Sequence, residues 1–135
     1  MFGNNKDIGL LILRLGFGLS MMIFHGFGKL KGGPEKWEKL GANMSNLGID
    51  FLPAFWGFMA AFSEFFCSFF IIIGLLFKPA TALLIMTMLV AVVMHMSLPE
   101  GTPGAGLSGA SHAIEYLVVY VALLFTGPGK YKIYK

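Results

Sequence analysis

Charge is scarce in this chain, because Lys, Arg, Asp and Glu together make up only 13% of its 135 residues. An ordinary soluble domain carries about 25% charged residues, which keep its surface solvated. Hydrophobic residues account for 56% of the chain, and a small domain leaves much of its surface exposed. In water, this composition would produce broad apolar patches. The shortage of charge excludes an ordinary soluble domain and predicts that lipid surrounds much of the protein.

Cysteine is almost absent as well. The single cysteine, Cys67, excludes an intramolecular disulfide and a Cys-x-x-Cys redox pair. It falls in an apolar run, where we expect it to pack as a small hydrophobic side chain. The lysines behind the net charge of +3 lie outside the apolar runs, which favours positions flanking membrane helices over nucleic-acid binding.

Four apolar stretches dominate the sequence, and each has the roughly 20 residues that a helix needs to cross a bilayer core of about 30 Å. They cover residues 8–28, 54–76, 79–98 and 109–127. We expect a single all-α domain over residues 1–135, built as a four-helix transmembrane bundle. We do not interpret the first stretch as a signal peptide, because Arg14 interrupts it and no small-residue cleavage site follows.

The segment between the first two stretches has a helical pattern of its own. One face repeats at i, i+3, i+7 and i+10 with apolar residues: Trp37, Leu40, Met44 and Leu47. Polar residues fill the remaining positions. This pattern favours a short amphipathic helix on the membrane surface with Trp37 at headgroup level, and the alternative is a soluble cap packed on the end of the bundle.

The lysine distribution bears on orientation. Four spans place both termini on the same side of the membrane, together with the loop around Lys78. Five lysines fall on that side and four on the other, so the positive-inside rule favours cytoplasmic termini by a narrow margin.

A carboxylate lies in the most apolar part of the chain, FMAAFSEFFCSFF (58–70), where Glu64 is surrounded by phenylalanines. Counted from residue 54, Glu64 is about 15 Å into its helix, close to the bilayer midplane. A charged side chain at that depth costs about 2.5–3.5 kcal/mol on insertion. We therefore expect Glu64 to face the bundle interior, to be paired or protonated, and to mark a functional site.

Possible partners share one face of the first stretch, at helical spacing: Arg14, Gly18, Met21 and His25, with Lys29 at the end of the stripe. A guanidinium can hold a carboxylate through two hydrogen bonds and does not deprotonate. Arg14 is therefore the predicted partner of Glu64. Such a buried pair could equally fix helix packing without any chemistry.

More ionisable residues fall in the half of the membrane bordered by the first and third loops, namely His25, His95, His112 and Glu115. Helix bundles build ligand sites from side chains on facing helices. We predict a polar pocket between the spans, lined by Arg14, His25, Lys29, Glu64, His95 and Glu115. Single histidines could instead be interfacial or structural. Haem or metal ligation is chemically conceivable, but no spacing matches a dedicated metal motif, so no metal site is predicted.

Three runs together resemble the DoxX family of small bacterial integral membrane proteins: LRLGFGLSMMIFHGFGKL (13–30), GLLFKPA (74–80) and LLFTGPGKYKI (123–133). The resemblance extends over nearly the whole chain. The family's first-helix arginine and H-G-x-x-K motif are matched by Arg14, His25, Gly26 and Lys29. Its second-helix glutamate is matched by Glu64, and its Gly-Pro-Gly exit by residues 127–129.

The resemblance implies a multi-pass protein of the bacterial inner membrane. The family is named after a subunit associated with a terminal quinol oxidase, and relatives are linked to thiosulfate:quinone oxidoreduction and to membrane redox or detoxification complexes. We expect an accessory subunit of a quinone-linked redox system, with a quinone as candidate ligand and other membrane or redox subunits as partners.

Catalysis by the isolated chain is not expected, because further thiols and an obvious electron carrier are missing from the sequence. Two other functions stay open. One is a purely structural membrane scaffold without a small-molecule ligand. The other is a small transporter or channel, which is disfavoured because no internal repeat or broken span is evident.

Overall fold

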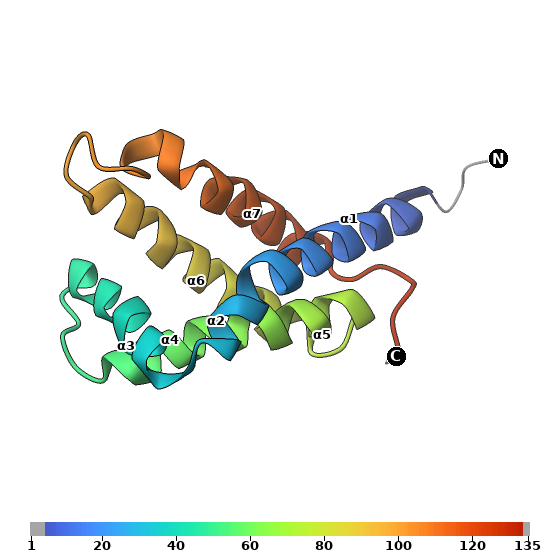
Figure 1. The fold of residues 1–135 in the computed structure, drawn as a ribbon. Coiled ribbons are helices and arrows are strands. Elements are labelled where there is room, and N and C mark those ends of the chain that lie inside the picture. The colour runs from blue at the N-terminus through green and yellow to red at the C-terminus, as the bar shows by residue number, and fades with distance from the viewer. Residues whose placement is uncertain (1–4, 134–135) are drawn as a thin grey trace.

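The computed structural model describes residues 5–133, and within this range the chain forms helices and loops without a β-strand (Figure 1). Four helices are long and apolar enough to cross a membrane: Asn5–Lys31, Pro53–Ile73, Phe77–Ser97 and Gly106–Thr126. Each overlaps one of the four predicted stretches, which confirms the all-α fold class. The second span ends at Ile73 rather than at residue 76, because Gly74 takes a left-handed conformation with φ of 76°.

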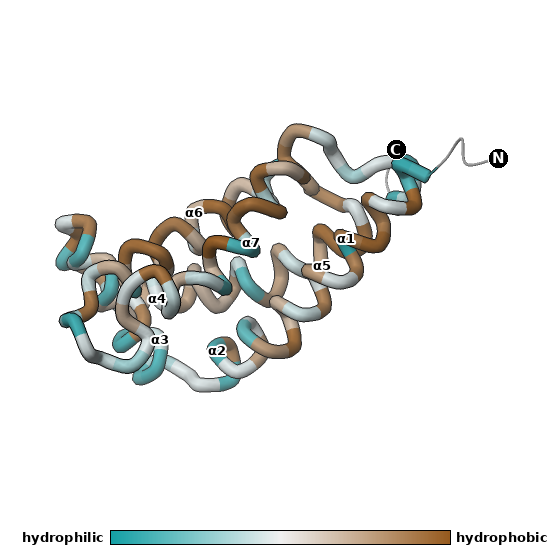
Figure 2. The backbone as a smooth tube through the Cα atoms, turned by 90° about the horizontal axis from the view of Figure 1, so that it is seen from above, coloured by the Kyte–Doolittle hydropathy of each residue, from teal (hydrophilic) through white to brown (hydrophobic). Residues whose placement is uncertain are grey.

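The first two spans are each built from two α-helical segments joined by a π-helical turn. The first combines α1 (Asn5–Met21), the turn Met22–Gly26 and α2 (Phe27–Lys31). The second combines α4 (Pro53–Phe62), the turn Ser63–Cys67 and α5 (Ser68–Ile73). The third and fourth spans are the uninterrupted helices α6 (Phe77–Ser97) and α7 (Gly106–Thr126). Figure 2 shows α6 hydrophobic along most of its length, whereas hydrophilic residues gather around α3.

The two π-helical turns meet inside the bundle. A Cβ added to Gly26 would lie only 2.6 Å from the backbone carbonyl carbon of Glu64, so the two backbones touch at this point. Glycine permits such close contact between membrane helices because it has no side chain to separate them. Because π-helical turns change the direction of the side chains that follow and are frequent at functional sites, this crossing organises the region around Glu64.

The predicted short helix between the first two spans is confirmed as α3 (Gly33–Gly41), followed by a 3₁₀ segment, Ala42–Leu47. It folds back against the first turns of α4. A Cβ on Gly41 would lie 1.5 Å from the Pro53 carbonyl oxygen, and one on Gly57 would lie 1.7 Å from the Trp37 carbonyl oxygen. Glycines at both contacts therefore allow α3 and α4 to form a tight helical hairpin at the end of the bundle remote from the termini (Figure 1).

Arg14 fixes the opposite end of the bundle, where both ends of the described chain lie (Figure 1). Its side chain is buried, and Nε donates to the Ile71 carbonyl oxygen at 2.9 Å. The terminal nitrogens donate to Ile72 at 2.7 Å, to Pro128 at 3.1 Å and to Tyr131. Two of the four acceptors, at Ile71 and Ile72, belong to the last turn of α5, so the guanidinium lies next to the negative end of that helix dipole and joins it to the segment after α7.

The predicted Arg14–Glu64 ion pair is therefore wrong. Arg14 lies opposite Ile71, which follows Glu64 by seven residues, or about 10 Å along a helix. Depth counted separately along each apolar stretch could not reveal this difference, because it depends on the register between two antiparallel helices. The arginine acts on main-chain oxygens, and its role in the described structure is architectural.

Candidate functional site

Glu64 pairs with Lys29 instead. The Lys29 ammonium nitrogen lies 2.8 Å from Oε1 and 2.6 Å from Oε2 of the carboxylate. Only 3% of the Glu64 side chain is exposed, against 27% for Lys29. Lys29 follows the π-helical turn of the first span by three residues, and Glu64 lies within that of the second span. The crossing of the two turns therefore places an acid and a base side by side inside the bundle.

The pair is not saturated with hydrogen bonds. Although Oε2 is close to the ammonium group, it has no correctly aligned hydrogen-bond partner among residues 5–133, and it is fully buried. A carboxylate has about four acceptor positions, so Glu64 keeps acceptor capacity. A buried acceptor without a partner is costly in protein interiors, which makes this oxygen a natural contact for a bound molecule.

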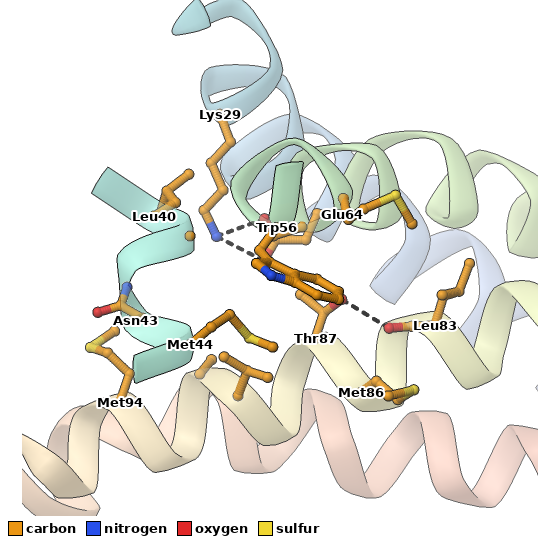
Figure 3. A pocket seen from close by; sticks show the side chains of 15 residues that line it. Lys29, Leu40, Asn43, Met44, Trp56, Glu64, Leu83, Met86, Thr87 and Met94 are labelled. Carbon is orange, nitrogen blue, oxygen red and sulfur yellow. Dashed lines mark hydrogen bonds and ion pairs between the residues drawn. The ribbon is translucent and has the colours of Figure 1, made fainter. Parts of the chain in front are cut away.

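A cavity of about 190 Å³ lies beside the ion pair (Figure 3). Side chains from the 3₁₀ segment, α4 and α6 line it together with Lys29 and Glu64. Most of the wall is apolar, and it includes four methionines: Met44, Met59, Met86 and Met94. An apolar chamber with a few convergent polar groups is the usual form of a small-molecule site.

Two other polar side chains in the cavity wall, Thr87 and Trp56, already have partners. The Thr87 hydroxyl lies 3.0 Å from the Ser63 hydroxyl and donates to the Leu83 carbonyl at 2.8 Å. The indole nitrogen of Trp56 donates to the Phe51 carbonyl at 2.9 Å. These bonds leave Lys29 and Glu64 as the charged groups of the wall. The cavity is therefore chemically suited to a molecule with an apolar body and one polar head.

Of the six residues predicted to line one pocket, only Lys29 and Glu64 line this cavity. Arg14 holds the opposite end of the bundle. The His25 ring packs edge-on against Tyr116, with ring centroids 5.7 Å apart. His95 contacts the loop between α6 and α7, where its Nδ1 lies 2.7 Å from the Gly104 carbonyl oxygen.

Glu115 is placed on the outside of α7, with 66% of its side chain exposed. His112, also on α7, has its Nδ1 3.7 Å from Glu115 Oε2. Within residues 5–133, no group of three or more His, Cys, Asp or Glu side chains gathers closely enough to hold a metal ion.

The sequence analysis considered only ionisable residues as pocket-lining candidates, and therefore it overlooked the apolar wall of the cavity. A signal was present in the helical spacing. Trp56, Ala60 and Glu64 follow one another at i, i+4 and i+8 on the second span. A small residue between two large ones at this spacing leaves room next to the carboxylate. On α6, Met86, Val90 and Met94 repeat the same spacing and face that room.

Comparison with protein families gives a match to the DoxX model over residues 9–97. This range holds most of the first span, all of the second and third, Arg14 and the Lys29–Glu64 pair. Neither a comparison with curated proteins nor one with solved structures gives a match. The family model covers well over half of the chain, and the four apolar helices agree with it. The chain belongs to the DoxX family and is a multi-pass membrane protein.

Proposed function

We propose that this protein is an accessory subunit of a membrane redox system and binds a lipid-soluble, quinone-like molecule in the cavity beside Lys29 and Glu64. The observation that carries the proposal is a buried ion pair, with one carboxylate oxygen lacking an aligned partner, next to an apolar cavity of about 190 Å³. The DoxX resemblance supports the quinone link. Other redox subunits are the proposed partners.

A quinone head suits this wall chemically. Its carbonyl oxygens accept hydrogen bonds, and the Lys29 ammonium group is a donor at the cavity wall. The hydroxyl groups of the reduced form donate, and Glu64 Oε2 has acceptor capacity. Methionine side chains are flexible and polarisable, so they adapt to a flat ring and make favourable contacts with it. The same wall would reject a strongly hydrophilic solute.

The proposed setting is the bacterial inner membrane, with cytoplasmic termini. In this orientation the α3–α4 hairpin lies on the far side of the membrane, and the cavity beside it is reached from that half of the bilayer. Lys31 precedes the hairpin, Lys36 and Lys39 lie on its α3 arm, and all three would lie among the lipid headgroups.

Arg14 favours a second candidate, a scaffold without a small-molecule ligand. All of the contacts made by this arginine are architectural, and buried polar groups can serve packing alone. The difference is that the Arg14 donors end on carbonyl oxygens, whereas Glu64 borders an empty volume and its Oε2, although 2.6 Å from the Lys29 ammonium nitrogen, has no aligned hydrogen-bond partner.

Binding of short-chain ubiquinone and menaquinone analogues to the purified protein tests the proposal, with fluorescence of Trp56 in the cavity wall as the signal. We expect Glu64→Gln and Lys29→Met to weaken binding by about tenfold or more, the loss that one charge-assisted hydrogen bond gives. Ala60→Phe, which fills the cavity while leaving both charged residues in place, should abolish binding.

His95→Gln is the matched control, because His95 is ionisable and lies outside the cavity wall. It should bind the analogues as the unmodified protein does. Thermal unfolding in the same detergent shows that each variant is folded. Equal affinity in all of the variants, or no affinity in the unmodified protein, would leave the scaffold as the better explanation.

A further inference from the structure

Glu115 is exposed at a depth where the bundle should face hydrocarbon. It is nine residues from the start of α7 at Gly106, or about 13.5 Å along the helix axis. The next residue, Tyr116, packs on His25, and the residue after His25, Gly26, contacts the Glu64 backbone. Glu115 therefore lies close to the level of the crossing π-helical turns, near the middle of the bundle.

A single copy of the chain leaves this carboxylate uncovered. The Glu115 side chain is 66% exposed and that of His112 is 80% exposed, although their nearest atoms are 3.7 Å apart. Ionisable side chains in membrane helices almost always face protein or a water-filled cavity, because hydrocarbon cannot solvate them. The outer face of α7 around these two residues thus lacks a covering surface.

We propose that a second copy of this chain covers this face, forming a dimer with its two-fold axis along the membrane normal. In such a dimer the same surface meets itself, so it must be self-complementary. The pair His112 and Glu115 meets this requirement, because it offers both a donor that can carry positive charge and an acceptor. His112 of each copy faces Glu115 of the other.

The helix geometry agrees with this pairing. A two-fold axis along the membrane normal places the α7 helices of the two copies parallel to each other. His112 and Glu115 are then offset by three residues, or about 4.5 Å along the axis, a distance that the two side chains can bridge. Two equivalent pairs form, one on each side of the axis.

The surface next to this face is shaped for close approach. A shallow groove of about 310 Å³ runs between α1 and α7, and its wall includes Leu13, Gly16, Ser20 and Tyr116. A Cβ added to Gly9 or Gly16 would meet no other atom within 4 Å, so these positions are open to the outside. They are seven residues apart on α1 and share a face. Glycines at such spacing let a neighbouring membrane helix pack closely.

The experiment measures the oligomeric state of the full chain in lipid nanodiscs and vesicles across a range of protein-to-lipid ratios. We expect a dimer. His112→Glu should weaken association by about tenfold, because it replaces two favourable contacts with repulsion among four carboxylates. The double variant His112→Glu/Glu115→His restores one acid and one base at each contact and should restore the dimer.

Cysteine cross-linking locates the interface. In a Cys67→Ala background, Ala122→Cys lies seven residues beyond Glu115 on the same face of α7 and should form a disulfide-linked dimer on oxidation. Leu89→Cys, on the exposed surface of α6, is the matched control and should not. The proposal would be overturned by a monomer at every protein-to-lipid ratio, or by a dimer whose stability His112→Glu does not change. Cross-linking of Leu89→Cys but not of Ala122→Cys would overturn it as well. A monomer would show that lipid or another protein covers the face.

Discussion

Each end of the bundle has a basic side chain that contacts its interior, a buried arginine at one end and a partly exposed lysine toward the other, but the two are used differently. At the terminal end, Arg14 donates to four main-chain oxygens from two parts of the chain. Toward the other end, Lys29 contacts one carboxylate, that of Glu64. One oxygen of this carboxylate has no aligned hydrogen-bond donor and lies beside a cavity. Depth in the membrane does not separate an architectural charge from the proposed ligand site. The two differ in how fully the hydrogen bonds of the charged group are satisfied and in whether empty space lies next to it.

Replacing Arg14 should have the largest effect on stability. Arg14→Met removes the charge and leaves carbonyl oxygens of residues 71, 72, 128 and 131 without this donor. We expect the free energy of unfolding to fall by about 3–5 kcal/mol, because several carbonyl oxygens lose a donor at once and each unsatisfied buried acceptor costs about 1–3 kcal/mol. Denaturant titration in detergent measures it. Arg14→Lys, which has fewer donors, should recover part of the lost stability. An unchanged denaturation midpoint for Arg14→Met would contradict the stabilising role of this arginine.

Replacing Glu64 should affect binding more than stability. Glu64→Gln leaves Lys29 without a counter-charge, but Lys29 is partly exposed, so we expect a loss of about 1–3 kcal/mol. The double variant Lys29→Gln/Glu64→Gln removes both charges and should regain stability without regaining affinity for quinone analogues. A double-mutant cycle of unfolding free energies measures the coupling. If the double variant bound the analogues normally, the charges would have no part in recognition.

Gly26 sets the spacing between the two π-helical turns. Gly26→Ala introduces a Cβ 2.6 Å from the Glu64 carbonyl carbon, so the backbones must separate, at a cost of about 1–3 kcal/mol. Gly28→Ala is the control, since its Cβ meets no atom within 4 Å and alanine favours a helix. In thermal unfolding, Gly26→Ala should have a lower melting temperature than the unmodified protein. Gly28→Ala should have an equal or higher one. The reverse order would mean that the turns do not touch.

The smallest effect is expected at Trp37, whose indole nitrogen donates to the Lys29 carbonyl at 2.9 Å. Trp37→Phe keeps the ring contact with Phe58 and removes this one hydrogen bond. We expect a loss of about 0.5–1.5 kcal/mol in unfolding free energy. Quinone-analogue affinity should fall slightly, because α3 holds the 3₁₀ segment over the cavity. Trp37→Ala should cause a larger loss of stability and of affinity than Trp37→Phe. If Trp37→Phe matched the unmodified protein in both measurements, the indole hydrogen bond would be unimportant.

The sequence predicted the elements of this fold well, because scarcity of charge and helical spacing are local properties. The four spans and the short helix before the second span follow from such patterns. The inward placement of Glu64 followed from the cost of a charge in hydrocarbon. These inferences require knowing that lipid is the solvent, but they do not require knowing how the helices are aligned with one another.

Partner choice could not be predicted in the same way. Arg14 and Lys29 lie on one stripe, and only the register between the first two spans decides which of them meets Glu64. The π-helical turns add to the difficulty, since they shift the side chains beyond them relative to an ideal helix. Glu115 was misplaced for a related reason, because the inward face of α7 is defined by its contacts with α6 and α1.

The Arg14 anchor has a consequence for how the protein is made. A ribosome synthesises residue 14 long before residues 128 and 131, so the guanidinium enters the bilayer while two of its acceptors do not yet exist. The contacts of Arg14 are therefore complete only after residues 128–131 have been synthesised. A chain released before Pro128 would hold the guanidinium with the Ile71 and Ile72 acceptors alone.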